Sequence, residues 1–217
     1  MFDCNKISRR GLMFILSAPS GTGKTTLSKM LKEEDEHIHT SISVTTREKR
    51  PEEKNGREYI FITRNEFRKM VENGEFLEYA EVFGNLYGTP KHFVEQKLAL
   101  GEDVLFDIDW QGHRQIISTA REDVASVFLL PPSKEELANR LIKRHIEDSD
   151  SLFVDYRLRE ADSEIMHWHE YDYIIINKYL DQSLSKLVSI LKAERLKKER
   201  RTGLKGFISS LVDHPVI

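Results

Sequence analysis

The hydrophobic positions of the chain fall into short runs, and helical patterns separate most of these runs. The runs are rich in β-branched or aromatic residues, which is typical of buried strands, and their alternation with helices indicates right-handed crossovers. We therefore predict an α/β fold with about five parallel strands flanked by helices. The predicted strands are Leu12–Ser17, Ile42–Thr45, Val104–Ile108, Ala125–Leu130 and Tyr173–Ile176.

Capping boxes mark two helix starts, because a serine or threonine is followed three residues later by glutamate. The box Ser133–Glu136 predicts a helix to about Ile146, and the box Thr63–Glu66 predicts a shorter helix that ends near Gly74.

A longer helix is predicted from Leu180 to Arg201. We interpret its basic side chains as a solvated helical face rather than a nucleic-acid patch, which is the commoner case for such a charge run. These side chains are Lys192, Arg195, Lys197, Lys198, Arg200 and Arg201.

The stretch after the second strand has a different pattern. Phe76–Phe83 alternates like a strand, Gly84-Asn85 is typical of a turn, and Leu86–Thr89 begins a return strand. Together with Tyr59–Ile62, this predicts a small antiparallel lobe inserted over residues 41–94. A helical, arginine-rich excursion is expected over 139–169, which leaves 10–40, 95–138 and 170–205 for the core domain.

The composition describes a soluble globular protein, with 39% hydrophobic and 32% charged residues among 217. A net charge of −3 gives no general attraction to nucleic acid, so we expect no nucleic-acid partner. The run Leu12–Leu16 is too short for a membrane span or a signal-peptide core. Cys4 is the single cysteine, which excludes an intramolecular disulfide and a cysteine zinc site. We expect a cytoplasmic protein without a membrane partner, and the sequence leaves open whether it is a homo-oligomer.

The first strand leads into a small-residue loop that ends in Gly23-Lys24-Thr25. Such a loop aims backbone N–H groups at phosphates, the lysine neutralises the β- and γ-phosphates, and the hydroxyl of Thr25 serves Mg²⁺, partly through water. Ala18 stands where the consensus has its first glycine, which is a small change at a strand exit. A plain strand–turn–helix is the alternative, but the context favours nucleoside triphosphate binding. The expected phosphate-binding residues are Ala18, Pro19, Ser20, Gly21, Thr22, Gly23, Lys24, Thr25 and Thr26.

A second phosphate site is predicted after Ile42–Thr45, where Arg47 and Arg50 stand three residues apart. Planar guanidinium groups suit a dianionic phosphate better than lysine does. Tyr59 and Tyr87 can each donate a phenol hydroxyl to the same phosphate. For either arginine taken singly, the alternative is a surface ion pair with one of the glutamates at 52 and 53.

Glu78 is the residue that first suggests a base-reading site, because a charge in the middle of an apolar strand needs a partner. A guanine base presents donors at N1 and N2, which suit a carboxylate, and acceptors at N7 and O6, which suit hydroxyls. Ser43 and Thr89 supply hydroxyls. Asp107 and Asp109 follow a buried strand, where ligands of parallel sheets bind.

These motifs, in their order and approximate spacing, resemble the guanylate kinases over about residues 10–200. The matching segments are Ser17–Thr25, Thr45–Pro51, Asn55–Phe61, Phe76–Ala80, Leu86–Thr89 and Leu105–Gly112. The resemblance implies a P-loop fold whose inserted lobe binds GMP. It implies transfer of the γ-phosphoryl group of ATP to GMP, and by extension to dGMP, with Mg²⁺. The residues implied to bind GMP are Ser43, Arg47, Arg50, Tyr59, Glu78, Tyr87, Gly88, Thr89, Asp107 and Asp109.

The resemblance also implies a lid over 139–169 whose arginines neutralise the transferring phosphoryl group. The matching residues are Arg140, Arg144 and Arg157, which join Lys24 and Arg47 as catalytic residues, and Asn177 is implied to border the adenine. No catalytic histidine is expected, because the GMP phosphate oxygen is already an anion. We therefore expect His113, His167 and His169 to be surface or hydrogen-bonded residues.

Three other functions share some of these sequence features. A phosphotransferase for ribosyl phosphates would lack the guanine-reading residues Glu78, Ser43 and Thr89. A non-catalytic, peptide-binding relative would typically have lost Lys24, which is present. A nucleic-acid-dependent ATPase rests only on the basic tail helix. The kinase hypothesis is favoured over all three.

Overall fold

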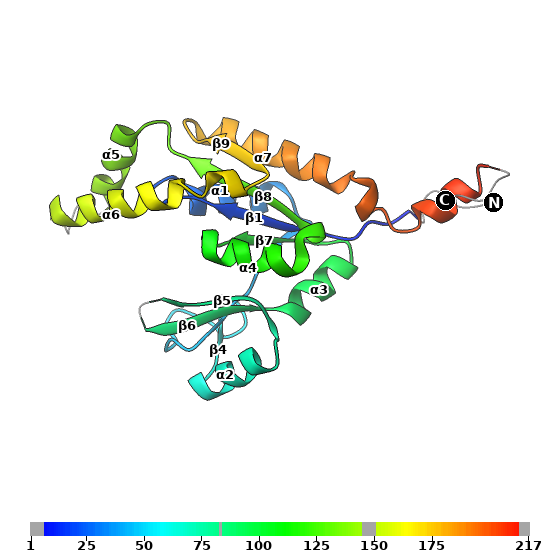
Figure 1. The fold of residues 1–217 in the computed structure, drawn as a ribbon, viewed down its shortest axis with the longest axis horizontal. Helices are drawn as coiled ribbons and strands as arrows, with labels where there is room; N and C mark the ends of the chain where they lie inside the picture. The colour runs from blue at the N-terminus through cyan, green and yellow to red at the C-terminus, as the bar shows by residue number, and fades with distance from the viewer. Residues whose placement is uncertain (1–6, 83, 145–150, 213–217) are drawn as a thin grey trace.

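The computed structural model describes residues 7–82, 84–144 and 151–212, with backbone alone for Arg144 and for 151–155. A five-stranded parallel sheet in the order β2-β7-β1-β8-β9 runs through its upper half (Figure 1). The central strand β1 pairs with β7 on one side and β8 on the other, with Met13 level with Val104 and Val124. The strands are β1 (Met13–Ser17), β2 (Ile38–Thr40), β7 (Asp103–Asp107), β8 (Val124–Leu130) and β9 (Tyr173–Ile176).

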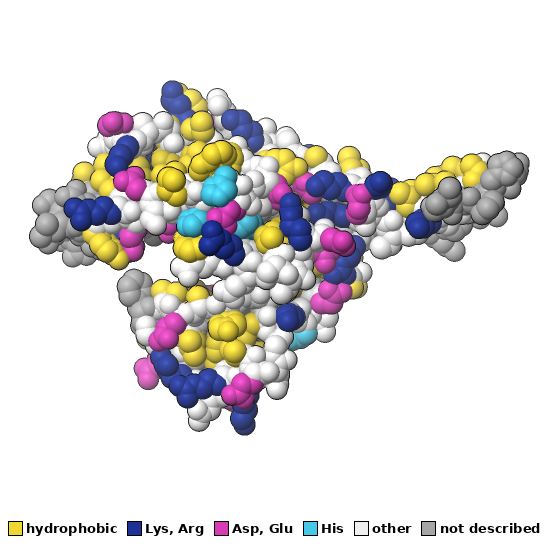
Figure 2. Space-filling view, in the orientation of Figure 1, with side chains coloured by type: hydrophobic (Ala, Val, Ile, Leu, Met, Phe, Trp, Pro, Cys, Tyr) yellow, Lys and Arg dark blue, Asp and Glu magenta, His cyan; other side chains and the backbone are white. Residues whose placement is uncertain are grey.

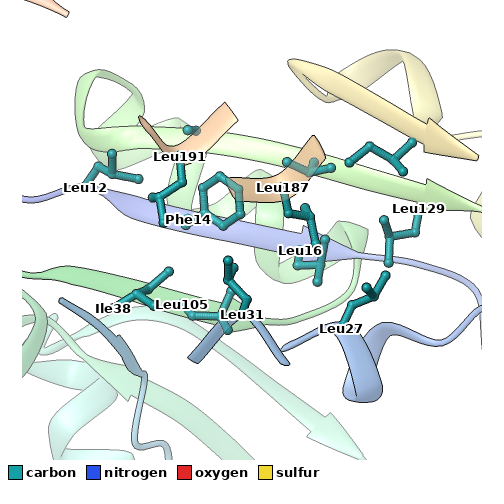
Figure 3. Packing of buried hydrophobic residues seen from close by; sticks show 13 residues of the cluster. Leu12, Phe14, Leu16, Leu27, Leu31, Ile38, Leu105, Leu129, Leu187 and Leu191 are labelled. Atoms are coloured by element: carbon teal, nitrogen blue, oxygen red, sulfur yellow. The ribbon is translucent and has the colours of Figure 1, made fainter. Parts of the chain in front are cut away.

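Two hydrophobic clusters cover the two faces of this sheet, and β1 contributes to both because its side chains alternate. Leu12, Phe14 and Leu16 meet helices α1 (Lys24–Glu34) and α7 (Leu180–Arg195), as Figure 3 shows. Met13 and Ile15 face α3 (Lys91–Ala99) and α4 (Trp110–Ala120). Burial on both faces explains why the run is continuously apolar.

A second sheet, in the order β4-β3-β6-β5, lies below the first in Figure 1. We call β3 through β6 together with α2 the lobe. Phe67 of α2 stacks on Phe76 of β5, with ring centroids 4.5 Å apart, and Val44 completes the buried cluster. The capping box at Thr63 and Glu66 is confirmed with both of its hydrogen bonds. The lobe elements are β3 (Val44–Thr45), β4 (Ile60–Phe61), α2 (Arg64–Glu72), β5 (Phe76–Val82) and β6 (Asn85–Pro90).

The lobe is attached to α4 through the open edge of β5. The side-chain amide of Gln115 accepts a hydrogen bond from the Tyr79 N–H and donates one to the Tyr79 carbonyl, each 3.0 Å long. One side chain therefore satisfies both backbone groups that a further strand would have paired.

Two helices extend beyond the sheet at the left of Figure 1, α5 (Lys134–Arg144) and α6 (Ser151–Ile165). They pack through Leu137, Leu141 and Ala161. Ser133 caps α5 by accepting a hydrogen bond from the Glu136 N–H, as expected. The predicted helix end near Ile146 lies outside the described residues. The remaining short helices are η2 (Arg121–Asp123), η3 (Trp168–Glu170), η4 (Lys198–Arg200) and α8 (Leu204–Ser209).

Two expectations about this architecture are wrong in detail. The fifth parallel strand is Ile38–Thr40, whereas the run Ile42–Thr45 contributes β3 to the lobe. The lobe sheet is also mixed rather than antiparallel, because β3 pairs with β4 in parallel. The edge strand β2 has just three residues, of which Ile38 alone is buried, so it leaves little hydrophobic pattern to detect.

The predicted basic helix is also shorter and less exposed than expected. It ends at Arg195, whose guanidinium binds Asp35 and Asp103 at 2.6 and 2.7 Å. Arg200 is buried and hydrogen-bonds Glu194. These two arginines therefore join the tail to the core instead of forming a basic surface. Within the described ranges, no helix is both long enough and apolar enough to cross a bilayer.

Candidate active site

The loop between β1 and α1 has the backbone geometry of a phosphate cradle. Gly21 and Gly23 have φ of 85° and 98°, and Gly23 is the N-cap of α1. A Cβ at Gly23 would lie 2.8 Å from Nδ2 of Asn177, so glycine is required there for space as well as conformation. The helix N-terminus and the loop N–H groups together favour an anion at this point.

Lys24 is the first residue of α1, and its side chain reaches the carboxyl end of β7. Its Nζ is 2.6 Å from Oδ1 of Asp107 and donates to the carbonyl of Ile108 at 3.4 Å. Ser17 donates to the same carbonyl at 2.8 Å. Asp107 thus holds the lysine where the sequence predicted a ligand site, at the ends of parallel strands.

A cavity of about 710 Å³ opens over the loop. Arg140 of α5 and Glu164 of α6 form part of its wall, and Glu164 was not predicted from the sequence. Burial raises the pKa of the Glu164 carboxyl, an effect that nearby Lys24 opposes. The full lining is Ala18, Pro19, Ser20, Gly21, Gly23, Lys24, Thr25, Thr26, Asp107, Arg140 and Glu164.

A second cavity, of about 450 Å³, shares Gly21, Gly23, Thr26 and Arg140 with the first and extends to Asn177 and the residues after it. Asn177 is buried and donates from Nδ2 to the carbonyl of Thr22 at 2.7 Å. Arg140 donates to the carbonyl of Asn177 at 3.4 Å. The loop, α5 and the end of β9 are therefore joined at one point.

Of the other two predicted lid arginines, Arg157 does not line this cavity. Arg157 on α6 donates to Glu160 of its own helix at 2.9 Å. The side chain of Arg144 lies outside the described part of the chain.

On the lobe, Arg47 has the aromatic neighbours expected for a phosphate site. Its guanidinium lies 5.6 Å from the ring centroids of Tyr59 and of Phe61, and the Tyr59 ring is 5.8 Å from that of Tyr87. Arg47 is also paired with Glu53, one of the two partners that the sequence left open. The side chain of Arg50 is exposed.

The predicted base-reading residues meet where β5 and β6 pair. Thr89 donates to Oε1 of buried Glu78 at 2.6 Å, and the hydroxyls of Ser43 and Thr89 are 3.4 Å apart. Burial raises the pKa of Glu78, the Thr89 hydrogen bond opposes that rise, and the charge of Asp109 adds to it. A Cβ at Gly88 would lie 2.9 Å from the ring of Phe76, so glycine there is a packing requirement.

Asp109 is the N-cap of α4, accepting from the N–H groups of Gln111 and Gly112. The charge of Asp109 also acts on Glu78 of the lobe, so Asp109 stands at the junction between the core and the lobe. Figure 2 shows a hollow between these two parts on the side of the β5–β6 hairpin.

The expectation that His113 is a surface or hydrogen-bonded residue is wrong. It is buried, it stacks on Tyr171 with centroids 4.1 Å apart, and neither ring nitrogen has a hydrogen-bond partner among the described residues. Burial lowers the pKa of His113 to about 4, so the ring is neutral. His167, by contrast, is bonded to Glu170 as expected.

Comparison with known proteins identifies this combination of loop and lobe. The family model described as guanylate kinase matches residues 10–194. The chain belongs to the guanylate kinase family. It is a nucleoside monophosphate kinase that phosphorylates GMP with ATP.

Individual relatives support the assignment. The chain is 53% identical to the guanylate kinases of Rhodopseudomonas palustris (strain BisB18) and Paramagnetospirillum magneticum, covering 94% of this chain and 93% or 95% of theirs. The crystal structure of guanylate kinase from Anaplasma phagocytophilum is 36% identical, with a TM-score of 0.74 over 97% of this chain and 99% of that one. The resemblance inferred from the motifs is confirmed.

Proposed function

We propose that the core and the lobe of this guanylate kinase divide the two substrates between them. ATP binds along the phosphate loop, with its adenine beside Asn177, and GMP binds on the lobe. The observation that carries this proposal is the cluster of buried Glu78 and Thr89 with half-buried Ser43, which lies next to the N-terminal turn of α4 in the core. A carboxylate and two hydroxyls match the donors and acceptors of guanine.

On the donor side, the loop N–H groups and Lys24 hold the β- and γ-phosphates. Mg²⁺ fits the residues present, because exposed Thr25 in the first turn of α1 and the oxygen of Asp107 are hard donors. Among the residues that the structure describes, no group of three or more His, Cys, Asp or Glu side chains is placed so that it could hold a metal ion. When bound, Mg²⁺ would neutralise negative charge on the ATP phosphates.

On the acceptor side, Arg47, Arg50, Tyr59 and Tyr87 hold the GMP phosphate. Glu78 accepts from the guanine N1 and N2 donors while Ser43 and Thr89 serve its acceptors, and Asp109 completes the base site. Buried groups of this kind reject adenine, which would leave them unpaired. Because these roles concern the base and the phosphate rather than the ribose, we extend the proposal to dGMP.

Transfer needs alignment and neutralisation of charge rather than a general base. The GMP phosphate oxygen is the nucleophile, and it forms its bond to the γ-phosphorus as the bond to the β-γ bridging oxygen breaks. Lys24, Arg47 and Arg140 offset the repulsion between the two anions, with Arg144 and Arg157 proposed to join them on closure. The residues around the loop cavity come from the core, α5 and α6, so the lobe must approach to bring the substrates together and exclude water.

The experiment is ADP release from Mg·ATP with GMP, dGMP, AMP, CMP or UMP offered in parallel. We expect turnover with GMP and dGMP alone. Equal ADP release with every nucleotide would overturn the base-reading roles.

We also propose a cytoplasmic location, since the one cysteine offers no intramolecular disulfide.

A further inference from the structure

Glu53 binds both phosphate-site arginines, which lie in the same loop. Its Oε1 accepts from Nη2 of Arg47 at 2.6 Å, and its Oε2 accepts from the backbone N–H of Arg50 at 2.9 Å. The main chain of Glu53 is held as well, because its N–H donates to the Arg50 carbonyl at 3.1 Å and its carbonyl accepts from Lys49 Nζ at 3.0 Å. The Glu53 side chain is 10% exposed.

The Arg47 guanidinium is fixed from several directions. Nη2 is bound by Glu53, Nη1 donates to the Glu48 carbonyl at 2.8 Å, and the rings of Tyr59 and Phe61 lie beside it. Such fixing removes much of the rotamer freedom that a long side chain would otherwise lose on binding a phosphate.

A carboxylate at this position can have one of two opposite effects. It can occupy Arg47 in place of the phosphate and compete with GMP, or it can remain bound and hold Arg47 in its working orientation. The contacts favour the second effect. Each carboxylate oxygen has its own partner, so Glu53 binds Arg47 through one oxygen and does not block it with a bidentate pair.

We infer that Glu53 is a positioning residue of the acceptor site, which orients Arg47 and shapes the loop around Arg50 for the GMP phosphate. This rests on the phosphate role proposed above for Arg47. The carboxylate is ionised in the working pH range, because Arg47 lowers the pKa of Glu53. Glu53 contacts no reacting atom and acts through the two arginines.

The test compares Glu53→Gln with Glu52→Gln, since Glu52 is the exposed neighbour with the same chemistry. Glutamine keeps an oxygen for the Arg50 N–H but loses the charge that holds Arg47. We expect KM for GMP to rise roughly tenfold in Glu53→Gln, the scale for loss of a charged hydrogen bond. KM for ATP should stay unchanged, and Glu52→Gln should match the parent protein.

Guanosine binding, measured by calorimetry, separates positioning from a general structural role. Guanosine lacks the phosphate, so its affinity should be the same in Glu53→Gln and the parent protein. Equal loss of guanosine and GMP affinity would show that the lobe has been damaged and would overturn the inference. A lower KM for GMP in Glu53→Gln would do so too, because it would identify Glu53 as a competitor.

Arg47→Met, assayed in parallel, separates a failure of the positioning role of Glu53 from a failure of the phosphate-binding role proposed for Arg47. If Arg47→Met raises KM for GMP and Glu53→Gln does not, the positioning role is wrong while the phosphate role of Arg47 stands. If neither change alters KM for GMP, the phosphate role is wrong and the inference fails with it.

Discussion

At the phosphate loop the groups offered to a ligand are mainly backbone N–H groups and one lysine, whereas the lobe offers the side chains of Arg47, Glu78 and Thr89. The loop's shape follows from two glycines with positive φ between a buried strand and a helix. The lobe's shape depends on ion pairs, hydrogen bonds and a small aromatic cluster. The donor site is therefore built into the main chain, and the acceptor site depends on how side chains pack.

This difference predicts which substitutions should impair the donor site and which should impair the acceptor site. Only a substitution by proline removes a main-chain N–H, so the donor site should tolerate most other changes except those at Lys24 and the glycines. The lobe should lose GMP affinity through changes at several positions, including ones that never contact GMP. The predictions below test this contrast, from the largest expected effect to the smallest.

Lys24→Ala should lower kcat by about 10³-fold or more, because a preorganised positive charge on the transferring phosphates is lost. ADP release in a coupled assay gives the measurement. Lys29→Ala, at an exposed position of the same helix, is the control and should retain full activity. Substantial turnover in Lys24→Ala would mean that the loop backbone alone suffices.

Phe67→Ala should destabilise the lobe by about 3 kcal/mol, the lower part of the range for a buried phenylalanine. Because its ring stacks on Phe76 away from the sheet of the core, the loss should be local. Hydrogen exchange should quicken across residues 60–90 while β1 stays protected. Exchange that quickens equally in both regions would show that lobe and core unfold as one unit.

Glu78→Gln should reduce kcat/KM for GMP by about 10²-fold, since the buried site then presents an amide to the guanine donors.

The parent protein should show the same loss of kcat/KM for GMP when the pH is lowered. The raised pKa of Glu78 means that it protonates at a higher pH than an ordinary glutamate, so kcat/KM for GMP should fall as pH drops through that value. Glu78→Gln should abolish this acid limb, and its persistence would assign the titration to another group.

Gln115→Ala should raise KM for GMP a few-fold, because two hydrogen bonds between α4 and the edge of β5 are lost, each contributing about 1 kcal/mol. KM for ATP should be unchanged. Gln96→Ala, an exposed glutamine on α3, is the matched control. An unaltered KM for GMP would show that the other contacts between β5 and α4 fix the lobe by themselves.

Much of the fold could be predicted because its signals are local. The apolar run of β1, the glycines after it, the capping box at Thr63 and the turn at Gly84 each specify a nearby structure. Features that depend on distant partners escaped prediction. Arg195 looks like an exposed helical arginine until the fold brings it to Asp35 and Asp103, 160 and 92 residues away in sequence.

In the candidate site, too, features with local sequence signals could be predicted, and features that depend on distant residues could not. The loop residues and the Glu78–Thr89 pair could be predicted from residue types on recognisable strands. The bond between Gln115 and Tyr79 could not, because it joins a helix side chain to a strand backbone 36 positions earlier. His113 was mispredicted because an aromatic neighbour, Tyr171, is reached only through the fold.

The ion pairs around buried Asp103 have a consequence for the order in which the chain acquires its structure during synthesis. Asp103 is held by the guanidinium groups of Arg9 and Arg195, and the backbone of Arg9 pairs with that of Arg201 in an isolated antiparallel β-bridge. The lobe is built from one continuous segment, so its contacts can form as soon as that segment leaves the ribosome. The nucleotide-binding core must wait for α7, and an incomplete chain can therefore hold a formed acceptor lobe beside an unfinished donor site.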